Sequence, residues 1–438
     1  MRFFHISDLH LGKMLHHVPL TETDQAFWVE RFLETVDEYR PDAVVIAGDI
    51  YDRRVPPVEA VRLFDRLLTG LAGRGIYVFV IPGNHDSAVR LSHVSELLET
   101  HRIYIAGELS RELMHVTVPG HPSRDLSDAV ASSTEPSPDV TFWLLPYLFP
   151  KAAADRHVLD RDDLESYDEA ARELLALQEI SPEGCNVLVA HQNVLAHGVK
   201  PEHSESETII GGIGEIDYTA FDAFDYVALG HIHNAQKVGR ETIRYSGCPL
   251  YYDFSEACRS KDLTMVTIRS KKEISVERIH IPLLHTLLQM KGTLKELLQE
   301  SERLEDRQSR YIQCILTDKH VPPRAMEKLR DVFGDSLVNV KREIRPEAGD
   351  PQERADGGGV LGQEEGAVSG PGLVEQFEQF YQEQTDELPD ADQEAVLQKI
   401  LEQQARRGED YLLKMSDIPQ EDSQELLETV LQGRRSAH

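Results

Sequence analysis

Cysteine is scarce in this sequence, and the few that occur follow no ligand or disulfide pattern. Four cysteines occur in 438 residues, and no two of them are spaced as CxxC. We therefore expect neither a disulfide framework nor a thiolate zinc site, and the expected location is cytoplasmic. No run of 18 apolar residues occurs either, so no membrane span is predicted. The opening MRFFHISD lacks the apolar stretch and small-residue cleavage site of a signal peptide.

Positive charge is also in short supply. The chain has 46 Lys and Arg against 76 Asp and Glu, a formal net charge of -30. Proteins that grip DNA with their whole surface are usually basic, so the total argues against tight DNA binding by this chain alone. Residues 346–438 are the most acidic part, with 7 basic and 22 acidic residues. The alternative is that the charge serves only solubility.

Short apolar runs alternate with helical patterns in the first half of the chain. Strands that alternate with helices predict a layered α/β domain over residues 1–282, and continuously apolar strands predict burial on both faces. Ligands in such sheets bind at the carboxyl ends of the strands. The expected strands are Arg2–Ile6, Ala43–Ala47, Tyr77–Ile81, Phe142–Pro146, Val187–Ala190 and Tyr226–Leu229. The expected helices are Thr23–Tyr39, Val58–Ala72, His93–Leu98 and Asp163–Glu179.

The remainder of the chain predicts three further parts. Residues 283–345 read as a small α+β domain, and residues 346–372, with eight glycines, read as a flexible linker. Residues 373–438 contain two helical patterns and a looser third one. The elements expected in the small domain are a helix near Thr293–Leu304, a strand Tyr311–Leu316, a helix Pro323–Phe333 and a strand Ser336–Arg342.

Five polar clusters, each at the end of an apolar run, carry the chemistry. They are Asp8-Leu9-His10, Gly48-Asp49-Ile50-Tyr51-Asp52, Gly83-Asn84-His85-Asp86, Ala190-His191-Gln192 and Gly230-His231-Ile232-His233. Their donors are carboxylate, amide and imidazole groups without cysteine, which suits Mn²⁺ or a similar ion better than structural zinc. Asp49 has two oxygens and could bridge two ions about 3.5–4 Å apart, as in two-metal hydrolases.

In their order, these clusters resemble the metallophosphoesterase (calcineurin-like) superfamily, and within it the SbcD family of nuclease subunits. The resemblance covers FFHISDLHLGK, AGDIYDRRVPP, IPGNHDS, AHQNV, ALGHIH, YSGCPLYYDFSE and the layout that follows. It implies an α/β layered sandwich with a small α+β capping domain and C-terminal helices. It also implies two divalent ions, Mn²⁺ first and Mg²⁺ as the alternative.

The same resemblance assigns roles to individual residues. It implies that His85 stabilises the transition state or protonates the leaving oxygen, and that Asp86 orients His85. Asp52, where archaeal relatives carry histidine, receives at most a supporting role. The implied ligands of one metal are Asp8, His10, Asp49 and His233, and those of the other are Asp49, Asn84, His191 and His231.

Apolar residues at helical spacing near the C-terminus point to a partner. The resemblance implies that these helices bind an SbcC-type coiled-coil ATPase, in a heterotetramer with two nuclease and two ATPase subunits. The alternative is that they dock onto their own catalytic domain. The expected partner-binding residues are Phe377, Phe380, Tyr381, Leu397, Ile400 and Leu401. Four basic residues beside the clusters could contact DNA phosphates or merely balance acidic neighbours: Lys13, Arg53, Arg54 and Arg90.

The favoured interpretation is therefore a DNA nuclease subunit. It would hydrolyse phosphodiesters as a double-strand exonuclease and single-strand or hairpin endonuclease, without sequence preference, in DNA end processing, repair, recombination and replication. One alternative is a small-molecule phosphatase or cyclic-nucleotide phosphodiesterase, against which the linker and helices argue. The other is a non-enzymatic scaffold, against which the intact ligand set argues.

Overall fold

The computed structural model describes residues 1–120, 137–160, 164, 166–202, 214–301, 303–304, 306–318 and 322–343. The chain divides into a unit from Met1 to Glu347 and a second from Ala348 to His438. The second unit, with the expected partner-binding helices and nearly all of the expected linker, lies outside the described residues.

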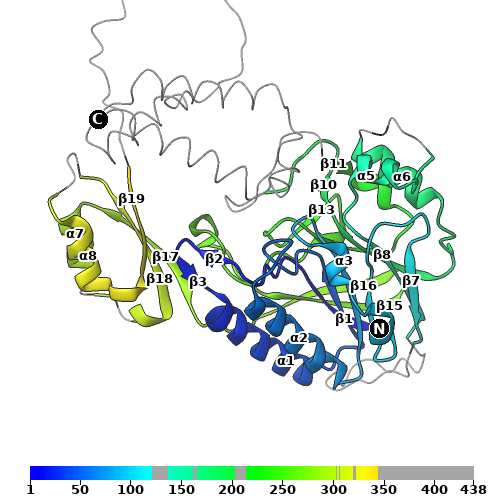
Figure 1. Ribbon diagram of the computed structural model, residues 1–438, viewed down its shortest axis with the longest axis horizontal. Coiled ribbons are helices and arrows are strands. Elements are labelled where there is room, and N and C mark those ends of the chain that lie inside the picture. Colours follow the sequence, from blue (N-terminus) through cyan, green and yellow to red (C-terminus); the bar gives the residue numbers. More distant parts are fainter. Residues whose placement is uncertain are drawn as a thin grey trace, which may run out of the picture. The chain divides into compact units, whose positions relative to one another are not determined.

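The first of two six-stranded sheets has the strand order β16-β15-β1-β4-β5-β6. Strands β1, β15 and β16 of this sheet are labelled in Figure 1. Strands β1, β4, β5 and β6 run parallel, and β15 and β16 add an antiparallel edge beside β1. The strands are β1 (Arg2–Ile6), β4 (Ala43–Ala47), β5 (Tyr77–Ile81), β6 (Ile103–Ile105), β15 (Leu263–Ser270) and β16 (Glu273–Ile279).

The second sheet has the order β13-β14-β12-β9-β8-β7, with β8, β9, β12 and β14 parallel. The outer strands β7 and β13 are antiparallel to their neighbours. The strands are β7 (Met114–Val118), β8 (Val140–Leu145), β9 (Cys185–His191), β12 (Tyr226–Gly230), β13 (Gln236–Val238) and β14 (Arg240–Tyr245). Two short pairs complete the domain: β2 (Met14–Leu15) with β3 (Val18–Pro19), and β10 (Asn193–Leu195) with β11 (Glu215–Asp217).

Alternating side chains on the strands build two cores from one sheet. On β1, Phe3 points into the core between the sheets, and Phe4 points into the core under the helices. On β4, Val45 likewise points into the core between the sheets, and Val44 points into the core under the helices. Because both faces are covered, β4 is buried at every position, as its apolar sequence predicts.

Helices cover the outer face of each sheet. The turn η1 (Thr21–Gln25), α1 (Ala26–Tyr39) and α2 (Val58–Ala72) lie over the first sheet, and α5 (Pro150–Asp155) and α6 (Tyr167–Ala176) over the second. The short helices α3 (Ala88–Leu91) and α4 (Ser95–Glu99) follow β5. This arrangement confirms the expected layered α/β fold.

A third, three-stranded sheet follows the sandwich. Its strands β17 (Thr286–Gly292), β18 (Arg310–Leu316) and β19 (Leu337–Arg342) are all parallel. Helices α7 (Leu294–Ser301) and α8 (Ala325–Phe333) pack on it around a separate apolar core. Three residues of these strands pack instead in the core beneath α1 and α2: Leu287, Tyr311 and Val338. We call residues 283–343 the small domain.

Several predicted boundaries require correction. The helix expected over Asp163–Glu179 is α6, which begins at Tyr167 because the Ser166 hydroxyl caps it by accepting a hydrogen bond from the Glu169 amide. The strand expected over Phe142–Pro146 is β8, which runs from Val140 to Leu145, and the strand expected over Val187–Ala190 is β9, which runs from Cys185 to His191. Strand β17 was not predicted. None of the described helices is long and apolar enough to cross a membrane.

Candidate metal centre

All seven expected metal ligands lie just beyond, or at, the carboxyl ends of parallel strands. This is the edge where α/β sheets bind ligands. Asp8 and His10 follow β1, Asp49 follows β4 and Asn84 follows β5. From the second sheet, His191 ends β9, and His231 and His233 follow β12. The two sheets therefore bring their polar strand ends to one place.

One group of side chains gathers around His10. Its Nε2 lies 3.1 Å from Nε2 of His233 and 3.7 Å from Oδ2 of Asp49. Ligand atoms of Asp8, His10 and His233 lie within 4.8 Å of one another, and all three residues are buried. Two ring nitrogens and two carboxylates directed at one small volume form a suitable donor set for a divalent cation.

A second group shares Asp49 with the first. Oδ2 of Asp49 lies 3.3 Å from Nε2 of His191. Oδ1 of Asn84 lies 3.1 Å from both His191 Nε2 and His231 Nδ1. Asp49 thus stands between the two groups, in the position that a bridging carboxylate requires.

Hydrogen bonds behind the ligands fix which atoms face the centre. His191 Nδ1 lies 2.8 Å from the Ala47 carbonyl oxygen, to which it donates, so Nε2 is the ring nitrogen that faces Asp49 and Asn84. The Asp8 carboxylate accepts from the Ser7 hydroxyl and from the His231 amide at 3.0 Å. These two candidate ligands, His191 and Asp8, therefore have a defined orientation.

The backbone at the centre is strained. Asp8, His10, Asp49 and His231 have φ values of 54°, 41°, 51° and 104°. Such conformations cost on the order of 1–3 kcal/mol each outside glycine and cluster at functional sites. Surrounding contacts must therefore hold these residues in place.

Two glycines provide space rather than flexibility. A Cβ on Gly83 would lie 2.2 Å from Asp49 Oδ1, and one on Gly230 would lie 1.9 Å from the Ala47 carbonyl oxygen. Any side chain at these positions would push Asp49 away or separate the two sheets. The glycines that precede Asn84 and His231 in the sequence are thus explained by close packing.

The contacts of His85 and Asp86 differ from the expectation. Asp86 does not orient His85: its carboxylate accepts from the backbone amides of Gly83, Ile50 and Tyr51 at 2.9–3.0 Å. It thereby ties the loop after β5 to the loop after β4. His85 Nδ1 instead lies 3.0 Å from the carbonyl oxygen of Asp52. The expected side-chain partner is therefore replaced by a backbone carbonyl.

Burial and charge shift the pKa values of the grouped residues in opposite directions. Burial lowers the pKa of His231 to about 3, helped by its neighbour His191. Burial also disfavours a charged His191, but the Asp49 carboxylate outweighs it and raises the pKa of His191 to about 9. Burial, with Asp49 nearby, raises the pKa of Asp86 to about 6. The centre is thus an electrostatically coupled group, typical of a functional site.

A buried charged group behind His233 was missed by the sequence analysis. His233 Nδ1 lies 3.5 Å from Glu256 Oε1, and Glu256 Oε2 lies 2.8 Å from Lys261 Nζ. The Cys248 thiol is 3.0 Å from the same Nζ. His233, Cys248 and Glu256 could themselves form a metal group, but the Lys261 ammonium already supplies the cation there. In the sequence, Glu256 and Lys261 look like ordinary surface charges.

The four basic residues near the clusters differ in their surroundings. Lys13 Nζ pairs with Asp52 Oδ1 at 2.8 Å, so it balances an acidic neighbour. Arg53, Arg54 and Arg90 are exposed. Nε of Arg53 lies 4.0 Å from Oδ2 of Asp52, a longer separation than the one between Lys13 and Asp52. These three arginines remain accessible to a polyanion.

Comparisons with known proteins identify relatives. Residues 1–235 match the sequence model of the calcineurin-like phosphoesterases. The chain is 28% identical over 341 residues to the SbcD component of the nuclease SbcCD from Staphylococcus epidermidis, covering 77% of this chain and 84% of that protein.

Similar solved structures include TT1561 of Thermus thermophilus, with 11% identity and a TM-score of 0.34. A dimetal phosphatase from Danio rerio has 13% identity and a TM-score of 0.35. Each comparison covers 63% of this chain and 98% of the other.

Proposed function

This chain belongs to the calcineurin-like phosphoesterase family, and from that premise we propose that it is the metal-dependent DNA nuclease subunit of an SbcCD-type complex. The observation that carries the proposal is the position of Asp49. It lies within 3.7 Å of His10 and 3.3 Å of His191, between two groups of donors. A shared carboxylate between two donor sets is what a two-metal phosphoesterase needs. The likeness to the SbcD component of an SbcCD nuclease supports DNA as the substrate.

We assign the residues to two overlapping sites. When bound, two divalent cations supply Lewis acidity toward the phosphate oxygens and a water activated for in-line attack. Oxygen and imidazole donors favour Mn²⁺, with Mg²⁺ as the alternative. The first site takes Asp8, His10, Asp49 and His233, and the second takes Asp49, Asn84, His191 and His231.

His85 is the residue proposed to move a proton. Its Nδ1 donates to the Asp52 carbonyl oxygen and its amide donates to Asp49 Oδ1 at 2.9 Å, so both backbone and ring are held beside the centre. This leaves Nε2 as the ring nitrogen that can donate to the leaving oxygen. General acids placed in this way contribute about 10²–10⁴-fold to rate. Asp86 acts indirectly, by holding in place the loop that carries Asn84 and His85.

The substrate is proposed to be DNA ends of any sequence, held by backbone contacts. Arg53, Arg54 and Arg90 are exposed near the centre and could contact phosphates, which fix position but carry no sequence information. Because the whole chain is acidic, we assign most DNA affinity to an SbcC-type ATPase partner. The tether would be the region 373–438, with Phe377, Phe380, Tyr381, Leu397, Ile400 and Leu401 as its anchors.

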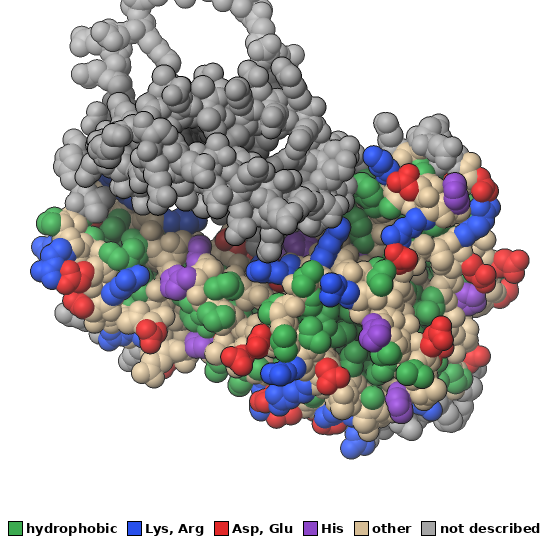
Figure 2. Space-filling view, in the orientation of Figure 1, with side chains coloured by type: hydrophobic (Ala, Val, Ile, Leu, Met, Phe, Trp, Pro, Cys, Tyr) green, Lys and Arg blue, Asp and Glu red, His purple; other side chains and the backbone are tan. Residues whose placement is uncertain are grey.

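An apolar surface on the sandwich supports an assembly with two nuclease subunits. Val58 and Val61 of α2 are 58% and 44% exposed, and Val89 of α3 is 63% exposed. Val94 and Leu97, at α4, are 48% and 69% exposed. Figure 2 shows hydrophobic side chains gathered over α2 and α3. Exposed apolar residues of this kind mark interaction sites, and we propose a second copy of the chain as the occupant because the family resemblance implies two nuclease subunits in one assembly.

The deciding experiment uses the purified full chain, with and without its ATPase, on end-labelled duplex DNA with Mn²⁺ or Mg²⁺. We expect metal-dependent cutting that the ATPase and ATP increase, and no cutting by Asp49→Asn. Hydrolysis of small phosphate monoesters without any cutting of DNA would contradict the proposal and favour a phosphatase. Metal binding without hydrolysis of either substrate would favour a scaffold.

A further inference from the structure

The turn that precedes α1 has an unusual geometry. Residues Thr21–Gln25 form a π-helical turn, in which the Gln25 amide donates to the Leu20 carbonyl oxygen at 2.9 Å. π-turns beside α-helices are rare and frequently occur at functional sites. Here the turn carries two adjacent buried side chains, Asp24 and Gln25, which are 4% and 1% exposed. Neighbouring residues on a helical turn point in different directions, and these two contact different parts of the molecule.

Gln25 holds the loop that carries His10. Its Oε1 accepts from the Gly12 amide at 3.0 Å. Its Nε2 donates to the His10 carbonyl oxygen at 2.8 Å and to that of Leu9 at 3.3 Å. His10 adopts a positive φ, which a histidine does not favour unless its surroundings hold it. The three bonds from Gln25 contribute to that constraint, together with the bond from the His10 amide to the Asp49 carbonyl oxygen at 3.0 Å.

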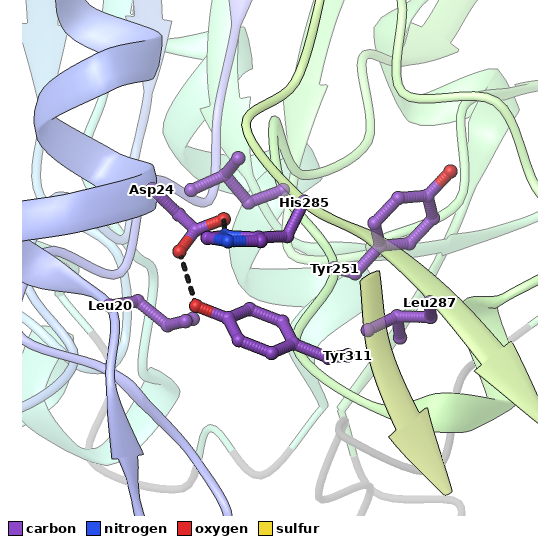
Figure 3. A pocket seen from close by; sticks show the side chains of 7 residues that line it. Leu20, Asp24, Tyr251, His285, Leu287 and Tyr311 are labelled. Atoms are coloured by element: carbon purple, nitrogen blue, oxygen red, sulfur yellow. Dashed lines mark hydrogen bonds and ion pairs between the residues drawn. The ribbon is translucent and has the colours of Figure 1, made fainter. Parts of the chain in front are cut away.

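Asp24 contacts the small domain instead. Its Oδ2 accepts from the Tyr311 hydroxyl at 2.7 Å, and its Oδ1 lies 3.0 Å from His285 Nδ1 (Figure 3). Leu20 and Leu287 pack around the same junction. The remaining space is about 10 Å³, too little for anything larger than a single water. The junction is therefore a packed domain contact and not a ligand pocket.

We propose that Asp24 and Gln25 link the seating of the small domain to the placement of His10. Gln25 and Tyr311 are then positioning residues for the metal centre, although neither is a metal ligand. Displacing Tyr311 would release Asp24, loosen the π-turn and weaken the three bonds that hold the His10 loop. The inference rests on the proposed function to the extent that it takes His10 as a metal ligand.

The direct test replaces Gln25 with leucine in the full-length chain. Gln25→Leu keeps the side-chain size and removes all three bonds. In Mn²⁺ titration calorimetry we expect one of two sites to weaken by about 10–100-fold, the range for outer-sphere partners of metal ligands. The site with Asn84, His191 and His231 should change much less, which general destabilisation would not produce. Equal affinities at both sites in the variant and the unaltered chain would overturn the inference.

A milder variant tests the connection to the small domain. Tyr311→Phe removes only the hydroxyl that donates to Asp24. Tyr251→Phe is the matched control, because Tyr251 lines the same junction but donates its hydroxyl to the Arg259 carbonyl oxygen at 2.9 Å. We expect Tyr311→Phe to weaken the His10 site by about 5-fold or more, within the usual range of coupling between sites. If Tyr311→Phe and Tyr251→Phe bind Mn²⁺ equally, the linkage is refuted.

The double variant Gln25→Leu with Tyr311→Phe shows whether the two residues act on the metal site through one chain of contacts or independently. If Tyr311 acts through Gln25, the effects of Gln25→Leu and Tyr311→Phe on Mn²⁺ affinity are less than additive. Additive effects would overturn the linkage. A full-length unaltered chain that binds no Mn²⁺ would instead refute the proposed function, so the two failures are distinguishable.

Discussion

The Nε2 atoms of His10 and His233 face each other at 3.1 Å, although 223 residues separate them in the sequence. His10 comes from the first sheet and His233 from the second. Each residue is supported from behind, because Gln25 holds the His10 backbone and Glu256 lies beside His233 Nδ1. The pairing therefore results from two independently supported loops that meet at the sheet edge, and the predictions below test that support.

Asp49 should be the residue whose loss disturbs both metals. It is the carboxylate that both donor groups share, so Asp49→Asn weakens two sites at once. We expect losses beyond the roughly 10–100-fold typical of outer-sphere partners. His10→Ala should chiefly affect one site. Calorimetry with Mn²⁺ measures both, and two fully occupied metals in crystals of Asp49→Asn would contradict the bridging role.

His85 should be needed for hydrolysis and not for metal binding. Its Nδ1 donates a hydrogen bond to the Asp52 carbonyl oxygen, and its expected role is proton transfer. His85→Gln should retain both metals in calorimetry and lose about 10²–10⁴-fold in hydrolysis of a chromogenic phosphodiester. His101→Gln, at an exposed histidine, serves as the control and should change neither. Loss of a metal from His85→Gln would show that His85 is a ligand.

Removing the charge of Glu256 should destabilise the fold and weaken metal binding. Glu256→Gln leaves the Lys261 ammonium buried, with its side chain 3% exposed and no full counter-charge. Breaking a buried pair in this way costs about 3–5 kcal/mol of unfolding free energy.

The matched control for Glu256 is Glu30→Gln, which breaks the exposed pair with Arg66. Those side chains are 45% and 54% exposed, so we expect a change of about 0–1 kcal/mol. Denaturant unfolding measures the difference between the two variants. Equal stabilities would show that the buried pair contributes no more than a surface one.

Removing residues 373–438 should separate phosphodiester hydrolysis from partner binding. The truncated chain should keep Mn²⁺-dependent activity on a small chromogenic ester, because its candidate ligands all lie before residue 234. It should lose co-purification with the ATPase and ATP-stimulated cutting of duplex DNA. Phe377→Ala with Phe380→Ala should cause most of that loss, since aromatic anchors dominate such grooves. Continued co-purification of the truncated chain would show that the tether lies elsewhere.

The fold was predictable where sequence periodicity and burial agree. Strands β1, β4 and β5 and helix α2 have the predicted bounds, because their apolar patterns coincide with the faces they bury. Strand β17 was missed because only Leu287 and Met290 are buried in it, a spacing that does not alternate as a strand should. Its identity as a strand comes from pairing with β18, which the sequence of β17 alone does not reveal.

The candidate site was predictable in its residue types and not in its supports. Short motifs at strand ends pointed to the seven ligand positions. The positive φ of His10 was not evident, since nothing local distinguishes a strained histidine from a relaxed one. Glu256 and Lys261 were missed because a buried pair and a surface pair look alike in sequence. The contact of Asp86 differs from the one that the family resemblance implied, because its carboxylate accepts from three backbone amides instead of orienting His85.

The division of the candidate ligands between the two sheets affects when the protein can become active. Asp8, His10, Asp49 and Asn84 come from the first sheet, while His191, His231 and His233 come from the second. During translation, the strands that carry Asp8, His10, Asp49 and Asn84 leave the ribosome before those of the second sheet. If the proposed ligand set is correct, no complete centre exists until His233 has emerged and the sheets have packed. An unfinished chain, or a fragment released by proteolysis between the sheets, would therefore be unable to cut DNA.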